Sequence, residues 1–138
     1  MKSKVVVFVV VMLSLSLSLS FGTAMALEFE PMAFQYLRSG TTDIGPGSNG
    51  SIYVYGNTLA KQVVNRVEVT IILQQYKNGA WVDYWSDRVV RHEATSATAE
   101  KMVSVQGGYQ YRLYGIHNVT HNNVSETTYT LTGSWYVN

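Results

Sequence analysis

The chain has 138 residues and no cysteine, and its ten Lys or Arg against nine Asp or Glu give a net charge of +1 at pH 7. Without cysteine there is no disulfide framework, so the fold must rest on its apolar core. The basic residues are scattered singly along the chain, which lacks the basic stripe or patch of a nucleic-acid-binding protein. The composition therefore excludes that class.

The first 26 residues predict a secretory signal peptide. A basic start (MKSK) precedes an unbroken apolar run over residues 5–13, and Ala24-Met25-Ala26 matches a small-residue cleavage site. A retained membrane anchor is the alternative, but four serines interrupt the apolar stretch that a spanning helix of about 20 residues needs. We expect cleavage after Ala26, secretion, and one mature domain of residues 27–138 without a membrane span.

Period-two alternation of apolar and polar residues predicts strands through the mature domain. Residues 34–39 (FQYLRS) alternate and predict an edge strand. Residues 40–50 (GTTDIGPGSNG) predict a loop, because Gly, Asn, Asp and Pro favour turns. Residues 51–57 are apolar on both faces, which favours a central position in a sheet.

The clearest strand covers residues 66–76, after a predicted connection over residues 58–65. Its alternate positions are apolar, as expected of an antiparallel strand with one buried face. Asn78-Gly79 follows, and this dipeptide is a strong signal for a tight hairpin turn. A return strand is expected over residues 80–90.

The polar residues 91–100 (RHEATSATAE) predict a loop or a short helical turn. Residues 103–119 then alternate on both sides of Gly107-Gly108, which predicts a central hairpin. A polar turn over residues 120–125 should lead into a last strand over residues 126–137.

In that last strand Gly133 is expected to mark a bulge. No stretch of ten residues in the mature domain has helical periodicity. The sequence therefore predicts an all-β fold: a single antiparallel β-sandwich of about seven strands.

Two resemblances refine this expectation. The stretch GGYQYRLYGIHNV resembles the penultimate strand of immunoglobulin-like and fibronectin type III domains, which implies that the Tyr111 hydroxyl bonds to backbone upstream. The mature chain is also similar to a family of small, uncharacterised secreted proteins of Gram-positive bacteria, in FEPMAFQYLRSG, YVYGNTLA, the NG-x-W hairpin and GYQYRLYGIHNV. This second resemblance implies fold and export, and it brings no activity or catalytic residues.

Residues able to perform catalysis are not grouped in recognisable motifs. There is no cysteine nucleophile and no G-x-S-x-G elbow. Asp83 and Asp87 would lie about 13 Å apart along one strand, beyond the roughly 5–10 Å of a glycosidase pair. His117 and His121, with Glu126, offer zinc-ligand types, but their spacing in strand and loop does not favour a metal site. We expect no enzyme activity, no cofactor and no metal.

The segment 80–88 (AWVDYWSDR) carries the one unusual pattern. Without a bulge its two Trp and two Asp residues share one face, and burying unpaired carboxylates is costly. Either a bulge changes the direction of the side chains or this face is exposed. An exposed face would suit glycan binding by Trp81, Tyr84 and Trp85; the alternative is that both tryptophans cover an open end of the sandwich.

Aromatic, weakly charged β-domains also suit protein contact, because Tyr and Trp are enriched at interfaces. An exposed edge such as residues 34–39 allows pairing with another chain, including self-association. The expectation is a secreted, non-enzymatic binding or structural domain that contacts an envelope or extracellular protein, with a carbohydrate-binding module as the alternative.

Overall fold

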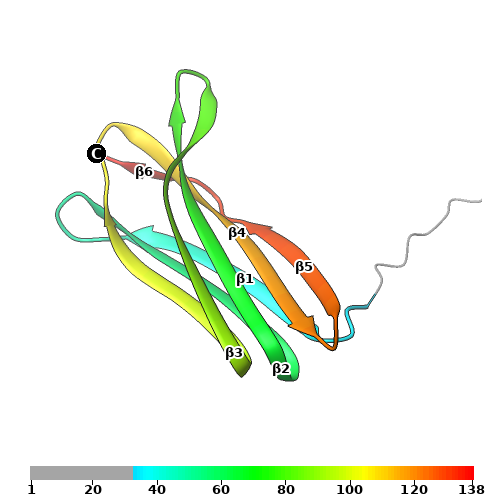
Figure 1. Ribbon diagram of the computed structural model, residues 1–138. Coiled ribbons are helices and arrows are strands. Elements are labelled where there is room, and N and C mark those ends of the chain that lie inside the picture. Colours follow the sequence, from blue (N-terminus) through cyan, green and yellow to red (C-terminus); the bar gives the residue numbers. More distant parts are fainter. Residues whose placement is uncertain (1–32) are drawn as a thin grey trace, which may run out of the picture. The chain divides into compact units, whose positions relative to one another are not determined.

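The computed structural model describes residues 33–138, and the predicted signal peptide with its cleavage site lies outside this range. It contains six strands: β1 (Leu37–Pro46), β2 (Ser51–Lys77), β3 (Ala80–Ser104), β4 (Tyr109–His121), β5 (Val124–Leu131) and β6 (Trp135–Val137). All neighbouring strands are antiparallel and join one sheet (Figure 1). The predicted all-β fold is confirmed, with six strands in place of about seven. Over these residues there is no helix that could cross a membrane.

The sheet curls on itself because its two longest strands bend together. The pairing of β2 with β3 is interrupted between Leu59 and Val64. Before the interruption β2 lies between β1 and β3, and after it β2 lies between β3 and β4. Figure 1 shows β2 and β3 turning back at the same end, which gives one continuous sheet two facing layers.

We call the part that contains β1, residues 51–59 and residues 96–104 the first layer. The second layer contains residues 64–77, residues 80–94 and β4 to β6. Because β2 and β3 run through both layers, the two separate sheets of an immunoglobulin or fibronectin sandwich are not confirmed. The sheet is a curled half-barrel instead.

The core lies between the two layers. The alternate residues Val67, Val69, Ile71 and Leu73 of β2 are fully buried, which confirms the strand predicted over residues 66–76. They meet the buried side chains of the first layer, including Leu37, Ile52 and Val54. Complete burial of each such aliphatic side chain contributes about 1.5–3 kcal/mol.

Two predicted connections are wrong because their residues lie in strands, and the loop predicted over residues 40–50 is confirmed only at residues 47–50, between β1 and β2. Residues 40–46 belong to β1, residues 58–65 continue β2, and residues 91–100 continue β3. Backbone pairing with the neighbouring strand holds these largely polar segments in strands.

The predicted hairpin over residues 103–119 is also wrong. β3 ends opposite the start of β2, whereas β4 pairs with β2, β5 and β6 and not with β3. Gly108, at φ +86°, turns the chain from the first layer to the second. The double glycine therefore joins the two layers.

Other local predictions are confirmed. Asn78 and Gly79 have φ of +53° and +79°, the paired positive angles of a type I′ hairpin turn. The polar turn before β5 is present. The single last strand expected over residues 126–137 is instead two strands, β5 and β6, and Gly133 lies in the break between them rather than in a bulge. Tyr111 is fully buried, and its hydroxyl donates to the carbonyl oxygen of Gln106 at 2.6 Å. The upstream backbone bond is therefore confirmed.

Candidate binding face on the second layer

A bulge in β3 decides where the predicted site residues lie. Leu73 pairs with Trp85, but the next residue of β2, Gln74, pairs with Asp83. Tyr84 is therefore an extra residue in β3. Because of this extra residue, Asp83 and Trp81 point to the opposite face from the one that strict alternation with Trp85 predicts. One of the two alternatives that the sequence pattern left open, a bulge, is therefore present.

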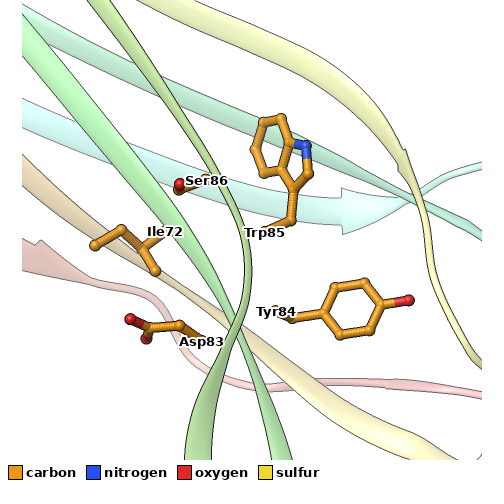
Figure 2. Close-up of a pocket in the computed structure, with 5 residues that line it drawn as sticks. All are labelled: Ile72, Asp83, Tyr84, Trp85 and Ser86. Atoms are coloured by element: carbon orange, nitrogen blue, oxygen red, sulfur yellow. The ribbon is translucent and has the colours of Figure 1, made fainter.

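The bulge separates the two tryptophans. Trp85 follows Leu73 toward the core, where it is half-buried, whereas Trp81 and Asp83 lie on the outer face of the second layer. Figure 2 shows Asp83 on the opposite side of β3 from Tyr84 and Trp85. The structure thus does not bring Trp81, Tyr84 and Trp85 into one patch.

Only a shallow hollow surrounds the bulge. It has a volume of about 210 Å³ and is lined by Ile72, Asp83, Tyr84, Trp85 and Ser86 (Figure 2). Ligand pockets usually enclose about 300–1,000 Å³. Tyr84 also packs edge-on against the core tyrosine Tyr111, with ring centroids 5.5 Å apart. This hollow therefore offers too little room to enclose a ligand of ordinary size.

Trp81 belongs to a linked cluster beside the hairpin turn. Its ring lies 5.2 Å from the ring of Tyr76, and the guanidinium carbon of Arg112 lies 4.3 Å from the Trp81 ring centroid. Arg112 Nε donates to Gln74 Oε1 at 2.8 Å, and Gln74 Nε2 donates to Asp83 Oδ1 at 3.0 Å. An arginine held over an aromatic ring gains about 0.5–1 kcal/mol at an exposed site. The cluster is thus a preorganised surface.

The same outer face continues across β4, β5 and β6. The rings of Tyr114 and Tyr129 stack with their planes 10° apart and their centroids 6.0 Å apart. Tyr129, Tyr136 and Leu131 remain 60%, 56% and 53% exposed. Side chains of the second layer that share this face define what we call the aromatic face: Tyr76, Trp81, Arg112, Tyr114, Tyr129, Leu131 and Tyr136.

The sequence pattern pointed to Trp81 as a candidate outward residue but did not point to Tyr129, Leu131 and Tyr136. Tyr129 and Leu131 alternate with threonines in residues 126–131, so the signal was present. What was absent was the pairing of β5 and β6 with β4, which joins these residues to Tyr114. The face exists only once these strands are aligned.

The histidines and Glu126 do not gather. His117 is fully buried, with Thr58 Oγ1 2.9 Å from Nδ1 and Thr130 Oγ1 2.7 Å from Nε2, and burial lowers its pKa. His121 Nδ1 instead accepts a backbone N–H at 3.2 Å. Within residues 33–138 no three His, Asp or Glu side chains are placed to hold a metal ion.

Glu126 holds residues 35–37, which lead into β1, by hydrogen bonds. Its carboxylate accepts the backbone N–H groups of Gln35, Tyr36 and Leu37 at 2.6, 2.8 and 2.7 Å. Desolvation raises the pKa of Glu126, but these three donors outweigh it and hold the pKa below its ordinary value. Glu126 is therefore a structural anchor.

Comparisons with known proteins add a family but no activity. No curated protein sequence matches the chain. A crystal structure of a protein from Archaeoglobus fulgidus is similar over 74% of this chain and 98% of its own, with 13% identity and a TM-score of 0.38. A likeness this distant carries no conclusion about function. The family described as "Family of unknown function (DUF6147)" matches residues 30–135.

Proposed function

Since the chain belongs to DUF6147, a family of unknown function, we propose a role from the site itself. The protein is a secreted, non-enzymatic binding domain that contacts another protein through the aromatic face, at or outside the cell envelope. The signal-peptide pattern of residues 1–26 supports this location at or outside the cell envelope, as does the resemblance to secreted Gram-positive proteins. The buried Tyr111 hydroxyl bond supports a distant relation to immunoglobulin-like or fibronectin domains.

The exposure of the aromatic face carries the proposal. Four of its side chains, Tyr76, Tyr129, Leu131 and Tyr136, are 43–60% exposed. At roughly 200 Å² for each large side chain they leave on the order of 400–500 Å² of mainly apolar surface open. The largest apolar patch of an ordinary monomer covers about 300–600 Å² and is often functional, so a patch of this size supports an interaction site here. It also supplies much of the roughly 800 Å² that each partner buries in a standard interface.

The composition of the face favours a protein over a glycan. Tyr, Trp and Arg are the residues that dominate protein-binding energy, and Leu131 adds an aliphatic contact. Sugars stack on an open ring face, whereas Arg112 covers one face of the Trp81 ring. The Asp83–Gln74 bond beside Trp81 is the feature that supports carbohydrate binding as the second candidate.

Site-specific crosslinking tests the protein contact. A photoreactive phenylalanine analogue is placed at position 129, and the labelled protein is illuminated with an envelope protein extract of the producing cells. We expect an adduct that excess unlabelled wild type suppresses and that the double variant Tyr129→Ala, Tyr136→Ala suppresses at least about tenfold less well. The matched control carries the label at Tyr55, on the outer side of the first layer.

Two outcomes would contradict the proposal. The first is equal competition by the wild type and the double variant; the second is equal labelling from position 55. Tryptophan fluorescence, titrated with peptidoglycan and with cellulose, tests the second candidate. A saturable change that Trp81→Ala abolishes, while circular dichroism shows an intact fold, would assign the face to glycans instead.

A further inference from the structure

One edge of the sheet is left without a partner over an unusual length. β3 pairs with β2 from Ala80 to Ser104, and no other strand among residues 33–138 pairs with β3. Figure 1 shows the returning part of β3 at the border of the first layer. The opposite side of β3 therefore presents free backbone donors and acceptors, which is the template for adding another strand.

Backbone geometry identifies the free groups in the first layer. Val105 N–H donates to the Gly50 carbonyl at 2.9 Å, so these two residues form a hydrogen-bonded pair. Such pairs alternate along an antiparallel ladder. Residues 97, 99, 101 and 103 therefore bond to β2, and residues 96, 98, 100 and 102 direct their N–H and C=O groups to the free edge. The bond from Gly47 N to Ser51 O, on the other side of β2, gives the same assignment.

The two halves of this edge differ in protection. In the second layer β3 carries Asp83, Asp87, Arg88 and Arg91 and the bulge at Tyr84, all of which hinder pairing with a further strand. Segment 94–99 (ATSATA), which runs from the bend into the first layer, has no charge and no proline. Thr98 in this segment is exposed, and so is Met102 just beyond it, to 55%.

We propose that residues 94–102 of β3 pair antiparallel with the same residues of a second copy, which forms a two-fold dimer with a sheet continuous across the interface. The segment is self-complementary about its middle residue, Thr98. Thr98 would lie opposite its own copy, a favourable cross-strand pair, and Ser96 would lie opposite Glu100. Lys101 would lie opposite Thr95. Neither charge of the segment then meets a like charge, whereas a register centred on Glu100 would oppose two carboxylates.

The dimer is independent of the proposed aromatic face, because Thr98 lies in the first layer. The concentration dependence of dimer formation is measured by sedimentation equilibrium of the mature protein over a wide range of concentrations. We expect a monomer–dimer equilibrium for the wild type and for Thr98→Val, which keeps the backbone N–H. Thr98→Val and Thr98→Pro both lose the Thr98 hydroxyl, which accepts from Asn57 Nδ2 at 2.8 Å. Compared with Thr98→Val, Thr98→Pro additionally loses a backbone donor that faces the free edge, and it should weaken association about tenfold or more.

Two further variants separate pairing from folding. Ala97→Pro removes a donor that bonds to β2, so it should lower the melting temperature, while Thr98→Pro should melt close to Thr98→Val, which lacks the same hydroxyl. Should Thr98→Pro nevertheless unfold, hydrogen exchange of the wild type decides the matter. The amides of residues 96, 98, 100 and 102 should gain protection as concentration rises, while those of residues 97 and 99 are protected throughout.

Three results would overturn the proposal. One is a monomer at every concentration with free-edge amides that exchange equally fast throughout. Another is a dimer that Thr98→Pro does not weaken, which would place the interface elsewhere. The third is protection of the free-edge amides only after an envelope protein extract is added, which would assign the edge to a strand of a different protein.

Discussion

At the residue scale, His117 is the most constrained polar group of the core. The Thr58 hydroxyl donates to the Glu68 carbonyl at 2.8 Å, so it accepts from Nδ1–H of His117. The Thr42 hydroxyl donates to Thr130 Oγ1 at 3.0 Å, and Thr130 in turn donates to Nε2. With this assignment of donors the hydrogen bonds fit the neutral imidazole with its proton on Nδ1. A proton on Nε2 would force Thr130 to reverse its hydroxyl.

The buried neutral histidine makes stability depend on pH. Because burial lowers the pKa of His117 in the folded state, the unfolded chain binds the proton first as pH falls below about 6.5. The free energy of unfolding should therefore have its full value above that pH and fall by up to about 1.4 kcal/mol per pH unit below it. Urea titrations at a series of pH values measure the slope.

The control for this prediction is His117→Gln, which keeps an amide donor and acceptor but does not titrate. The variant should be less stable at neutral pH because the hydrogen-bond geometry changes, yet its stability should vary less between neutral and mildly acidic pH. An identical pH slope in the wild type and the variant would show that His117 is not the titrating group.

At the element scale, the position of β1 depends on a glycine, Gly40, which has no side chain to occupy the space beside His117. A Cβ atom on Gly40 would overlap the imidazole ring of His117, whereas a Cβ on Gly45 would meet no atom within 4 Å. The two glycines lie in the same strand. Gly40 therefore lets β1 fit against the second layer, whereas Gly45 is not constrained by packing.

Alanine substitutions test this difference directly. Gly40→Ala should destabilise the protein by about 1–3 kcal/mol, because the added methyl group overpacks a buried ring. Gly45→Ala should be neutral or stabilise by up to about 1 kcal/mol, since it restricts the unfolded chain without a clash. Thermal unfolding of both variants measures the contrast, and equal effects would contradict the packing assigned to Gly40.

The Glu126 anchor fixes the chain that leads into β1. Glu126→Gln keeps the shape but removes the charge shared by three backbone donors, so we expect a loss of about 1–3 kcal/mol of local stability. Hydrogen exchange at Tyr36 and Leu37 should accelerate, while exchange in the buried part of β2 should not. Glu100→Gln is the matched control, because Glu100 accepts only from the exposed Tyr53 hydroxyl.

Acid should reproduce this release in the wild type. The pKa of Glu126 is lowered in the folded state, so its contribution is present above the ordinary carboxyl pKa and is lost as pH falls through the lowered value. Amides of residues 35–37 that stay protected after the Glu126 carboxylate is protonated would show that other contacts hold this segment.

At the scale of the whole molecule, the sequence predicted what depends on neighbours along the chain. Alternation in residues 66–76 and the Asn78-Gly79 turn were predicted correctly because side-chain period and turn conformation are local properties. The curl of the sheet was not predicted. It arises where β2 and β3 bend together, and the polar residues there resemble a loop until both strands are paired.

The candidate site was predictable to the same limited extent. The pattern of residues 80–88 required a bulge or an exposed Trp face, and the structure has both features: a bulge at Tyr84 and an outward Trp81. The aromatic face was beyond prediction because Tyr129 and Tyr136 join it only through pairing with β4. A double glycine likewise cannot reveal whether it turns a hairpin or joins two layers.

The long β2–β3 hairpin also sets an order of events in folding. Its pairing spreads outward from Asn78-Gly79, so each new contact closes only a short additional loop. The segment that leads into β1 has the opposite character, because the backbone N–H groups of Tyr36 and Leu37 donate to Glu126, which is 90 and 89 residues away in sequence. Contacts of such high sequence separation form slowly. β1 itself pairs with the nearby residues 52–60 of β2, but the segment before it can be fixed only after Glu126, close to the end of the domain, has been synthesised.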